Sequence, residues 1–299
     1  MSEPKESALR KKLESLENMP TIPVVLAPLL RYLEQPLDRL EVQQVVDLIS
    51  QDKSLAAQCL HLANSPLYGR WQTVDSIRSA VVALGLQRMR DIAVSCSVLT
   101  LIPQGKSKLD PMVFWEHSLG CALVCRQFAR RVGFVDPGKA YLGGLLHDIG
   151  VVACLSAMPQ EYRLALDLAQ AQHIPLHEAE ISTLGLTHCD AGKIVAERWH
   201  FTPDLIAVVG WHHHPHSAPC NRDLVALVSL ADLLCRMSGL GHGSIEDREV
   251  RFVEEPGFGL LVEECPALKD FDWARFTFEL ETYMEEVKRL VTLLYRPSQ

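Results

Sequence analysis

Apolar residues recur along the chain at the three- and four-residue spacing of a helix, and the alternation typical of a half-buried strand is scarce. Val42, Val45, Val46 and Ile49 form one apolar stripe, and residues 273–295 carry another along their whole length. The same spacing predicts further helices over 159–172, 176–184, 188–199, 203–213 and 221–238. The pattern therefore predicts an all-α fold.

Several predicted helix ends carry residues that satisfy free backbone groups. Asp38 to Glu41 has the spacing of a capping box, and Asp136-Pro137 places an N-cap before a proline at the first helical position. Gly85 and Gly133 stand where helices should stop. Glycine and charge are frequent over 239–259, so we expect a loop there.

The polar segment 103–110, which contains Gly105, is expected to link two helical subdomains. We expect residues 1–105 to form an N-terminal helical subdomain and residues 106–240 to form a second one. Residues 241–299 should add a C-terminal loop and helix.

Composition and charge narrow the classes of function. Of the 299 residues 48% are hydrophobic and 22% charged, and the net charge is −8. Nucleic acids bind basic surfaces through their phosphates, whereas this chain is acidic overall, so we expect no nucleic-acid partner. We identify no apolar run of the roughly 18–20 residues that span a bilayer. Residues 1–18 are polar and charged. We therefore expect no membrane partner and a cytoplasmic location.

The nine cysteines are scattered and include no Cys-x-x-Cys pair. Cys121 and Cys125 share an apolar helix face, where a lone thiol is usually a core residue. We interpret the cysteines as reduced, small hydrophobic residues.

Candidate chemistry lies in polar residues on otherwise apolar faces. His147 and Asp148 follow a predicted helix, and His117 shares a face with Phe114 and Cys121. Asp232 shares a face with Leu224, Val228 and Cys235, where an ionised carboxylate is costly to bury unless it is paired or binds a metal. Adjacent imidazole and carboxylate groups can both reach one metal ion, and a carboxylate can bridge two.

Two further features complete the set. His188 shares a face with Gly192 and Val195, and a run of three histidines over 212–214 ends a predicted helix. Singly, each such residue is more often a core histidine or a cap, but together they supply nitrogen and oxygen ligands suited to iron, manganese or zinc. The other histidines are interpreted as surface or core residues: His61, His173, His177, His200, His216 and His242.

The order of these residues resembles that of the HD phosphohydrolase superfamily. A narrower resemblance, over roughly residues 19–240, is to HDOD domains (HD-related output domains). It rests on Met19-Pro-Thr-Ile-Pro23, Leu62-Ala-Asn-Ser65, Trp115-Glu-His-Ser118, Leu142-Gly-Gly-Leu-Leu-His-Asp-Ile-Gly150 and His212-His-His-Pro215. The resemblance implies that the second subdomain is an HD-type helical bundle.

The resemblance also implies a pair of metal sites, with ions about 3.5–4 Å apart. Site 1 would comprise His117, His147, Asp148 and Asp232. Site 2 would share Asp148 and add His188, His212 and His213, although the three-histidine run leaves a shift to His214 open. One or two transition-metal ions are expected, iron or manganese before zinc.

The chain departs from HD-GYP phosphodiesterases, the related cyclic-dinucleotide enzymes, at two places. Their lysine after the His-Asp-x-Gly string is Val151 here, and their Gly-Tyr-Pro element is replaced by His214-Pro-His-Ser-Ala-Pro219. Arg126 and Lys193 are candidates to replace the missing cation.

The resemblance favours a bacterial signalling or regulatory module that keeps the metal site without catalysis, and no catalytic residue is assigned. A metal-dependent phosphohydrolase acting on a nucleotide or phosphodiester is the alternative, and a scaffold with an empty site is a third. Expected partners are signalling proteins or a small phosphorylated ligand.

Overall fold

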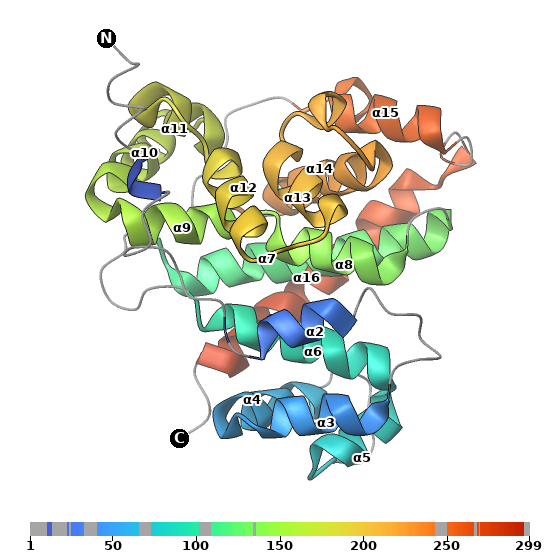
Figure 1. Cartoon of the computed structure of the whole chain (residues 1–299). Helices are drawn as coiled ribbons and strands as arrows, with labels where there is room; N and C mark the ends of the chain where they lie inside the picture. Colours follow the sequence, from blue (N-terminus) through green and yellow to red (C-terminus); the bar gives the residue numbers. More distant parts are fainter. Residues whose placement is uncertain are drawn as a thin grey trace. The chain divides into compact units, whose positions relative to one another are not determined.

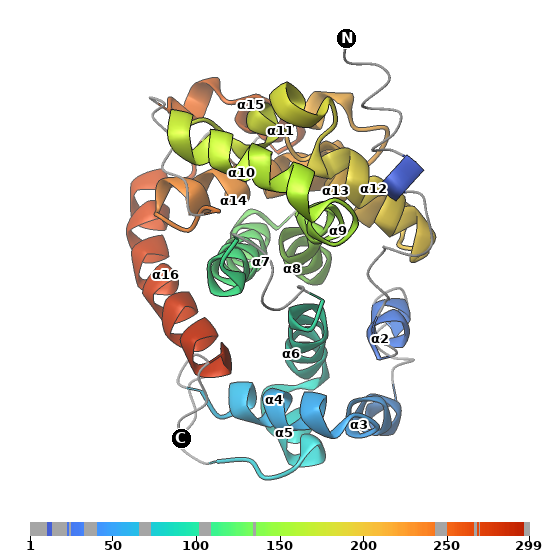
Figure 2. The same cartoon turned by 90° about the vertical axis from the view of Figure 1, so that its left-hand side faces the viewer.

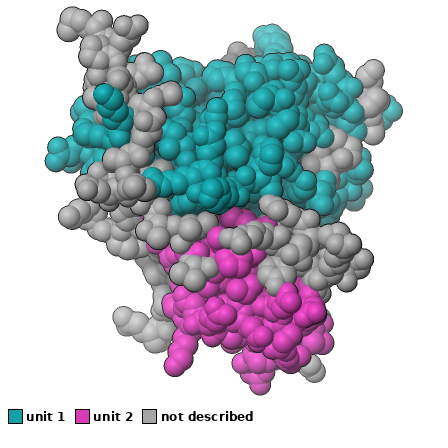
Figure 3. Space-filling view, viewed as in Figure 1, with its two compact units in different colours: residues 1–20, 102–284 teal, residues 21–101, 285–299 magenta. Residues whose placement is uncertain are grey.

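The computed structural model describes residues 11–13, 23, 25–32, 41–65, 73–101, 109–133, 136–242, 250–265, 268 and 270–295. Across these ranges the regular structure is helical and no strand occurs, which confirms the all-α prediction. The chain divides into two compact units (Figure 3): unit 1 is Met1–Pro20 with Ile102–Met284, and unit 2 is Thr21–Leu101 with Glu285–Gln299. The domain boundaries expected from the sequence stay a prediction.

Unit 2 is built around one largely buried helix, α6. Its helices are α2 (Leu26–Tyr32), α3 (Val42–Ser50), α4 (Lys53–Ala63), α5 (Ile77–Leu84) and α6 (Leu86–Leu99). The first four all contact α6 (Figure 1). Gly85 separates α5 from α6 at a φ of 88°, in the region that favours glycine.

Unit 1 carries the polar residues singled out in the sequence. It contains α7 (Pro111–Val132), α8 (Pro137–Leu146), α9 (Ile149–Ala157), α10 (Pro159–Gln172), α11 (Leu176–Leu184), α12 (His188–Arg198), α13 (Pro203–Trp211), α14 (Arg222–Met237), α15 (Pro256–Glu264) and the first half of α16 (Trp273–Tyr295). Helix α7 packs against α8, and α14 packs against both. In Figure 2, α7, α8 and α9 are seen nearly end-on, and α10 runs obliquely toward α9.

The structure tests two local predictions, the N-cap at Asp136 and the loop over 239–259. Asp136 caps α8 by accepting hydrogen bonds from the backbone N–H groups of Gly138 and Lys139, as expected. The loop predicted over 239–259 is wrong at its end, because α15 begins at Pro256. The two glycines of α15 made this segment resemble a loop in composition, although the helix buries Leu260 and Leu261. The predicted capping box at Asp38 and most of the predicted linker lie outside the described residues.

Two glycines allow the helices of unit 1 to approach closely. A Cβ at Gly144 of α8 would lie 2.6 Å from the backbone oxygen of Cys121 in α7. A Cβ at Gly150 of α9 would lie 1.8 Å from the backbone oxygen of His188 in α12. Glycine is therefore required at both crossings. The crossing at Gly150 brings the start of α12 next to the start of α9.

The segment Pro137–Ala157 has the length and apolar composition of a membrane span, contrary to the reading of the sequence. Its most apolar window is 94% buried inside the molecule, as in the core helices of a globular domain. Helices α8 and α9 meet within it at His147 and Asp148.

Candidate metal centre

The polar residues predicted to ligate metal come from five places in unit 1. His117 lies within α7, His147 is the C-cap of α8 and Asp148 is the N-cap of α9. His188 begins α12, His212 and His213 follow α13, and Asp232 lies within α14. All of them are buried except His213, which is 12% exposed. The structure therefore brings together side chains that are 115 positions apart at the extremes.

Asp148 lies at the centre of the cluster, and its two oxygens face different histidines. Oδ2 lies 3.1 Å from His147 Nε2 and 3.3 Å from His117 Nε2. Oδ1 lies 3.2 Å from His188 Nε2 and 3.5 Å from His212 Nε2. One carboxylate thus separates the residues of site 1 from those of site 2, which is the arrangement that a bridging ligand needs.

Four histidine rings are oriented by hydrogen bonds at Nδ1. In each case the partner is a carbonyl or carboxylate oxygen, which can only accept, so Nδ1 carries the proton. The acceptors are Leu240 O for His117 (2.6 Å), Gly144 O for His147 (2.8 Å), Glu180 Oε2 for His188 (2.8 Å) and Val208 O for His212 (3.1 Å). In the neutral ring this leaves the lone pair on Nε2, which faces Asp148. Metal-ligating histidines typically have this arrangement.

The Nε2 atoms also face one another at short distances. The pairs lie 3.2 Å apart for His117 and His147, 3.3 Å for His188 and His212, and 3.1 Å for His188 and His213. Facing lone pairs repel unless a proton or a cation lies between them. Two ligands about 2.0–2.1 Å from one ion are separated by roughly 3 Å, so the observed spacing fits a shared ion.

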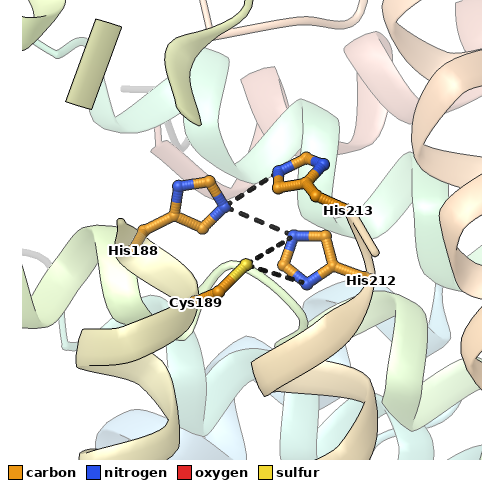
Figure 4. A group of neighbouring side chains, drawn as sticks. All are labelled: His188, Cys189, His212 and His213. Atoms are coloured by element: carbon orange, nitrogen blue, oxygen red, sulfur yellow. Dashed lines mark hydrogen bonds between the residues drawn. The ribbon is translucent and has the colours of Figure 1, made fainter. Parts of the chain in front are cut away.

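Two of the three consecutive histidines, His212 and His213, face the cluster. Figure 4 shows His212 and His213 facing His188 from the opposite side, whereas His214 is exposed. The ring of His177, from α11, stacks on His213 with centroids 4.0 Å apart.

Asp232 connects site 1 to a cation. Its Oδ1 lies 3.3 Å from His117 Nε2 and accepts a hydrogen bond of 3.0 Å from Arg236 Nε. The two cations considered from the sequence lie elsewhere, since Arg126 stacks on Tyr141 and Lys193 stacks on Trp211. Val151, at the position of the missing lysine, is fully buried.

The cluster shifts the pKa values of its own members. Burial by itself would raise the pKa of Asp148, but the charge of His147 and hydrogen bonds from His117 and His188 hold it well below its ordinary value. Burial would lower the pKa of His117, but hydrogen bonds to Asp148 and Asp232 raise it to about 10. The carboxylates therefore stay ionised and attract positive charge, whether as protons or as a metal ion.

Three residues belong to the centre although the sequence interpretation left them out. Glu180, which is fully buried, orients His188 and also accepts a hydrogen bond from the Tyr162 hydroxyl. His177 stacks on His213, and His242 Nε2 lies 2.9 Å from Asp148 Oδ2. The interpretation of His177 and His242 as unrelated to the cluster is therefore wrong. Neither position carries a periodic pattern that points to the cluster.

Two thiols lie beside the histidines. Cys121 Sγ is 3.7 Å from His117 Nε2, and Cys189 Sγ is 3.9 Å from His212 Nε2 (Figure 4). Among the described residues, four overlapping groups could hold a metal ion: His188, Cys189, His212 and His213; His117, Cys121, His147 and Asp232; His117, Asp148 and His242; and His147, Asp148 and His212. The cluster could thus hold a metal ion, as expected. Because two of the groups include a thiol, zinc is a candidate beside iron and manganese.

The comparisons with known proteins agree with this architecture. An HDOD domain protein of unknown function from Geobacter sulfurreducens is 30% identical, with a TM-score of 0.85 and 98% of each chain covered. A protein of Shewanella amazonensis SB2B whose name suggests a phosphohydrolase shares the fold at 24% identity, with a TM-score of 0.72 and coverage of 96% of this chain and 98% of that one.

A curated relative shares only part of its length with this chain. It is an uncharacterised protein of Treponema pallidum (strain Nichols), 24% identical over 227 residues, which are 75% of this chain and 43% of that protein. The chain thus spans less than half the length of that relative. The HDOD domain family matches residues 19–215, about two thirds of the sequence. The chain belongs to the HDOD domain family.

Proposed function

We propose that this chain is a signalling or regulatory HDOD module whose unit 1 holds one or two transition-metal ions beside Asp148. The observation that supports this most directly is the orientation of four histidines, each held at Nδ1 so that Nε2 faces an oxygen of Asp148. Site 1 would use His117, His147, Asp148 and Asp232, and site 2 would use Asp148, His188, His212 and His213. The donors suit iron or manganese, and the neighbouring thiols keep zinc among the candidates.

The proposed role is binding rather than turnover. A pair of metal ions supplies an activated water and a clamp for phosphate when it is bound. Phosphoryl chemistry also needs charge where negative charge develops in the transition state, and loss of one such contact costs about 10²–10³ in rate. Val151 is apolar and buried at the position of the relatives' lysine, and Arg236 is paired with Asp232. Regulation through signalling proteins or a small phosphorylated ligand, in the cytoplasm, is part of this proposal.

A metal-dependent phosphohydrolase is the second candidate. It is favoured by the bridging position of Asp148, because the same arrangement serves hydrolysis in two-metal enzymes. Such an enzyme would act on a nucleotide or another phosphodiester.

Metal content tests the proposed site. Purified wild-type protein, never exposed to chelator, should contain up to two transition-metal ions per chain by elemental mass spectrometry. The Asp148→Ala variant should lose both, because the shared ligand is removed. Asp167→Ala is the matched control, since that partly exposed carboxylate of α10 pairs with Arg163 at 3.8 Å and belongs to none of the metal-holding groups. A wild-type protein without metal, or an Asp148→Ala variant with unchanged metal, contradicts the proposal.

Turnover separates the two candidate functions. Protein loaded with manganese or iron is assayed against cyclic dinucleotides, linear dinucleotides and nucleotides. We expect no turnover above the metal alone. Hydrolysis that depends on metal and disappears in Asp148→Ala would instead establish the phosphohydrolase.

A further inference from the structure

The chain just after α14 forms a tight, well-anchored turn beside site 1. Gly239 has a φ of 77°, and Leu240 N–H donates back to Cys235 O at 2.9 Å, as in a Schellman cap. Leu240 is 2% exposed and lies against Gly120 of α7, where a Cβ would meet it at 2.8 Å. The carbonyl of Leu240 accepts the Nδ1 proton of His117. This turn therefore orients a site 1 histidine through its backbone.

The same turn delivers His242 to the metal cluster. Its Nε2 lies 2.9 Å from Asp148 Oδ2, the oxygen that faces site 1, and its ring centroid lies 4.6 Å from that of His117. Phe114 packs edge-on against the ring at 5.9 Å. The side chain is only 9% exposed, and Nε2 makes no hydrogen bond although it is buried. A buried, unsatisfied nitrogen next to a carboxylate oxygen needs a partner.

We propose that His242 Nε2 is an additional protein ligand of site 1 and occupies a position on the ion that water or phosphate would otherwise take. The inference rests on the proposed function, because it requires an ion in site 1. Structural metal sites are closed by protein ligands, whereas catalytic sites keep a position open for water or substrate. With His242 in place, site 1 gains a fifth protein donor beside His117, His147, Asp148 and Asp232. An anionic oxygen could take the position of His242 on that ion only after His242 moves away.

The test counts water on the ion. Manganese-loaded wild-type protein, His242→Gly and His242→Leu are compared by the relaxation rate that bound Mn²⁺ imparts to water protons. Loss of the imidazole should let a water bind, so the relaxivity per ion should rise in both variants. Added imidazole should return His242→Gly toward the wild-type value. The His216→Gly variant, at an exposed histidine that belongs to none of the metal-holding groups, should behave as wild type.

Manganese affinity gives a second readout. Removing even an outer partner of a ligand costs about 10–100-fold in metal affinity, so loss of a direct ligand should weaken one of the two sites by at least that factor. His242→Leu keeps an apolar side chain against Phe114 but offers no ligand atom, and a circular dichroism melt shows whether each variant is folded.

The outcomes separate this inference from the function on which it rests. If wild type binds two ions while the folded His242 variants keep wild-type relaxivity and affinity, His242 is not a ligand and only this inference is overturned. If wild type binds neither manganese nor any other transition-metal ion, the proposed function falls and this inference with it. Raised relaxivity that imidazole reverses supports both.

Discussion

A histidine can bind a metal ion only through a nitrogen that carries no proton, so the partner of the opposite nitrogen decides whether the ring is ready. In three of the four oriented histidines that partner is a backbone carbonyl, which no side-chain substitution can remove. His188 is the exception, because Glu180 accepts both its Nδ1 proton and its backbone N–H. Glu180 is therefore the side chain through which site 2 can be weakened without touching a ligand.

The Glu180→Gln variant should bind metal at site 2 about 10–100-fold more weakly, as for other outer partners of ligating histidines. The neutral amide no longer attracts the Nδ1 proton as strongly, so the ring is held less firmly. Affinity is measured by competition with a coloured chelator. Glu178→Gln, an exposed position on the same helix, is the control and should match wild type. Equal affinities in the two variants would contradict the role given to Glu180.

At the scale of helices, the cluster depends on ends and crossings more than on helix faces. His147 and Asp148 occupy the break between α8 and α9, and His188 begins α12. The break and the start of α12 are adjacent because Gly150 lets α9 and α12 touch backbone to backbone. A side chain there would separate Asp148 from His188.

The Gly150→Ala variant should be destabilised by about 1–3 kcal/mol or more, the usual cost of overpacking, because backbone atoms have to move. Site 2 should also lose affinity as His188 shifts. Gly259→Ala in α15 is the matched control, since a Cβ there meets nothing within 4 Å. Alanine in place of a helical glycine should be neutral or stabilise by about 0.4–1 kcal/mol. Urea unfolding midpoints of the two variants distinguish them, and equal midpoints would refute the crowding at the crossing.

At the scale of the molecule, the proposed ligands draw on α7, α12, α14, the break between α8 and α9, and the end of α13. Their charges and facing nitrogens are buried together in unit 1. An ion that binds only the folded state stabilises it by mass action, so metal should contribute to the stability of unit 1.

Metal removal should therefore lower the melting temperature. At a free ion concentration about 100 times the dissociation constant, binding contributes about 2.7 kcal/mol, which corresponds to about 5–10 °C for a domain of 150–250 residues. Scanning calorimetry with and without chelator measures the shift. Asp148→Ala should melt at the same temperature in both conditions. A chelator effect of equal size in that variant would place the stabilising ion elsewhere.

Much of the fold was predictable from the sequence because helix formation is local. The apolar period predicted α10, α11 and α16 with their observed bounds, and Asp136-Pro137 predicted the start of α8. The same reasoning failed at α15, because Gly257 and Gly259 are typical of a loop. The burial of Leu260 and Leu261, which stabilises this helix, is a tertiary contact.

The sequence also indicated which polar side chains would be buried, because His117 and Asp232 stand on apolar stripes where only a partner or a metal offsets their burial. The sequence does not show which atoms face Asp148, which ring nitrogen carries the proton, or that Glu180 and His242 join the cluster, and these became visible in the folded chain. Those properties depend on helix crossings and on turns between distant segments. Periodicity reports the face on which a residue lies, not the neighbours that it meets.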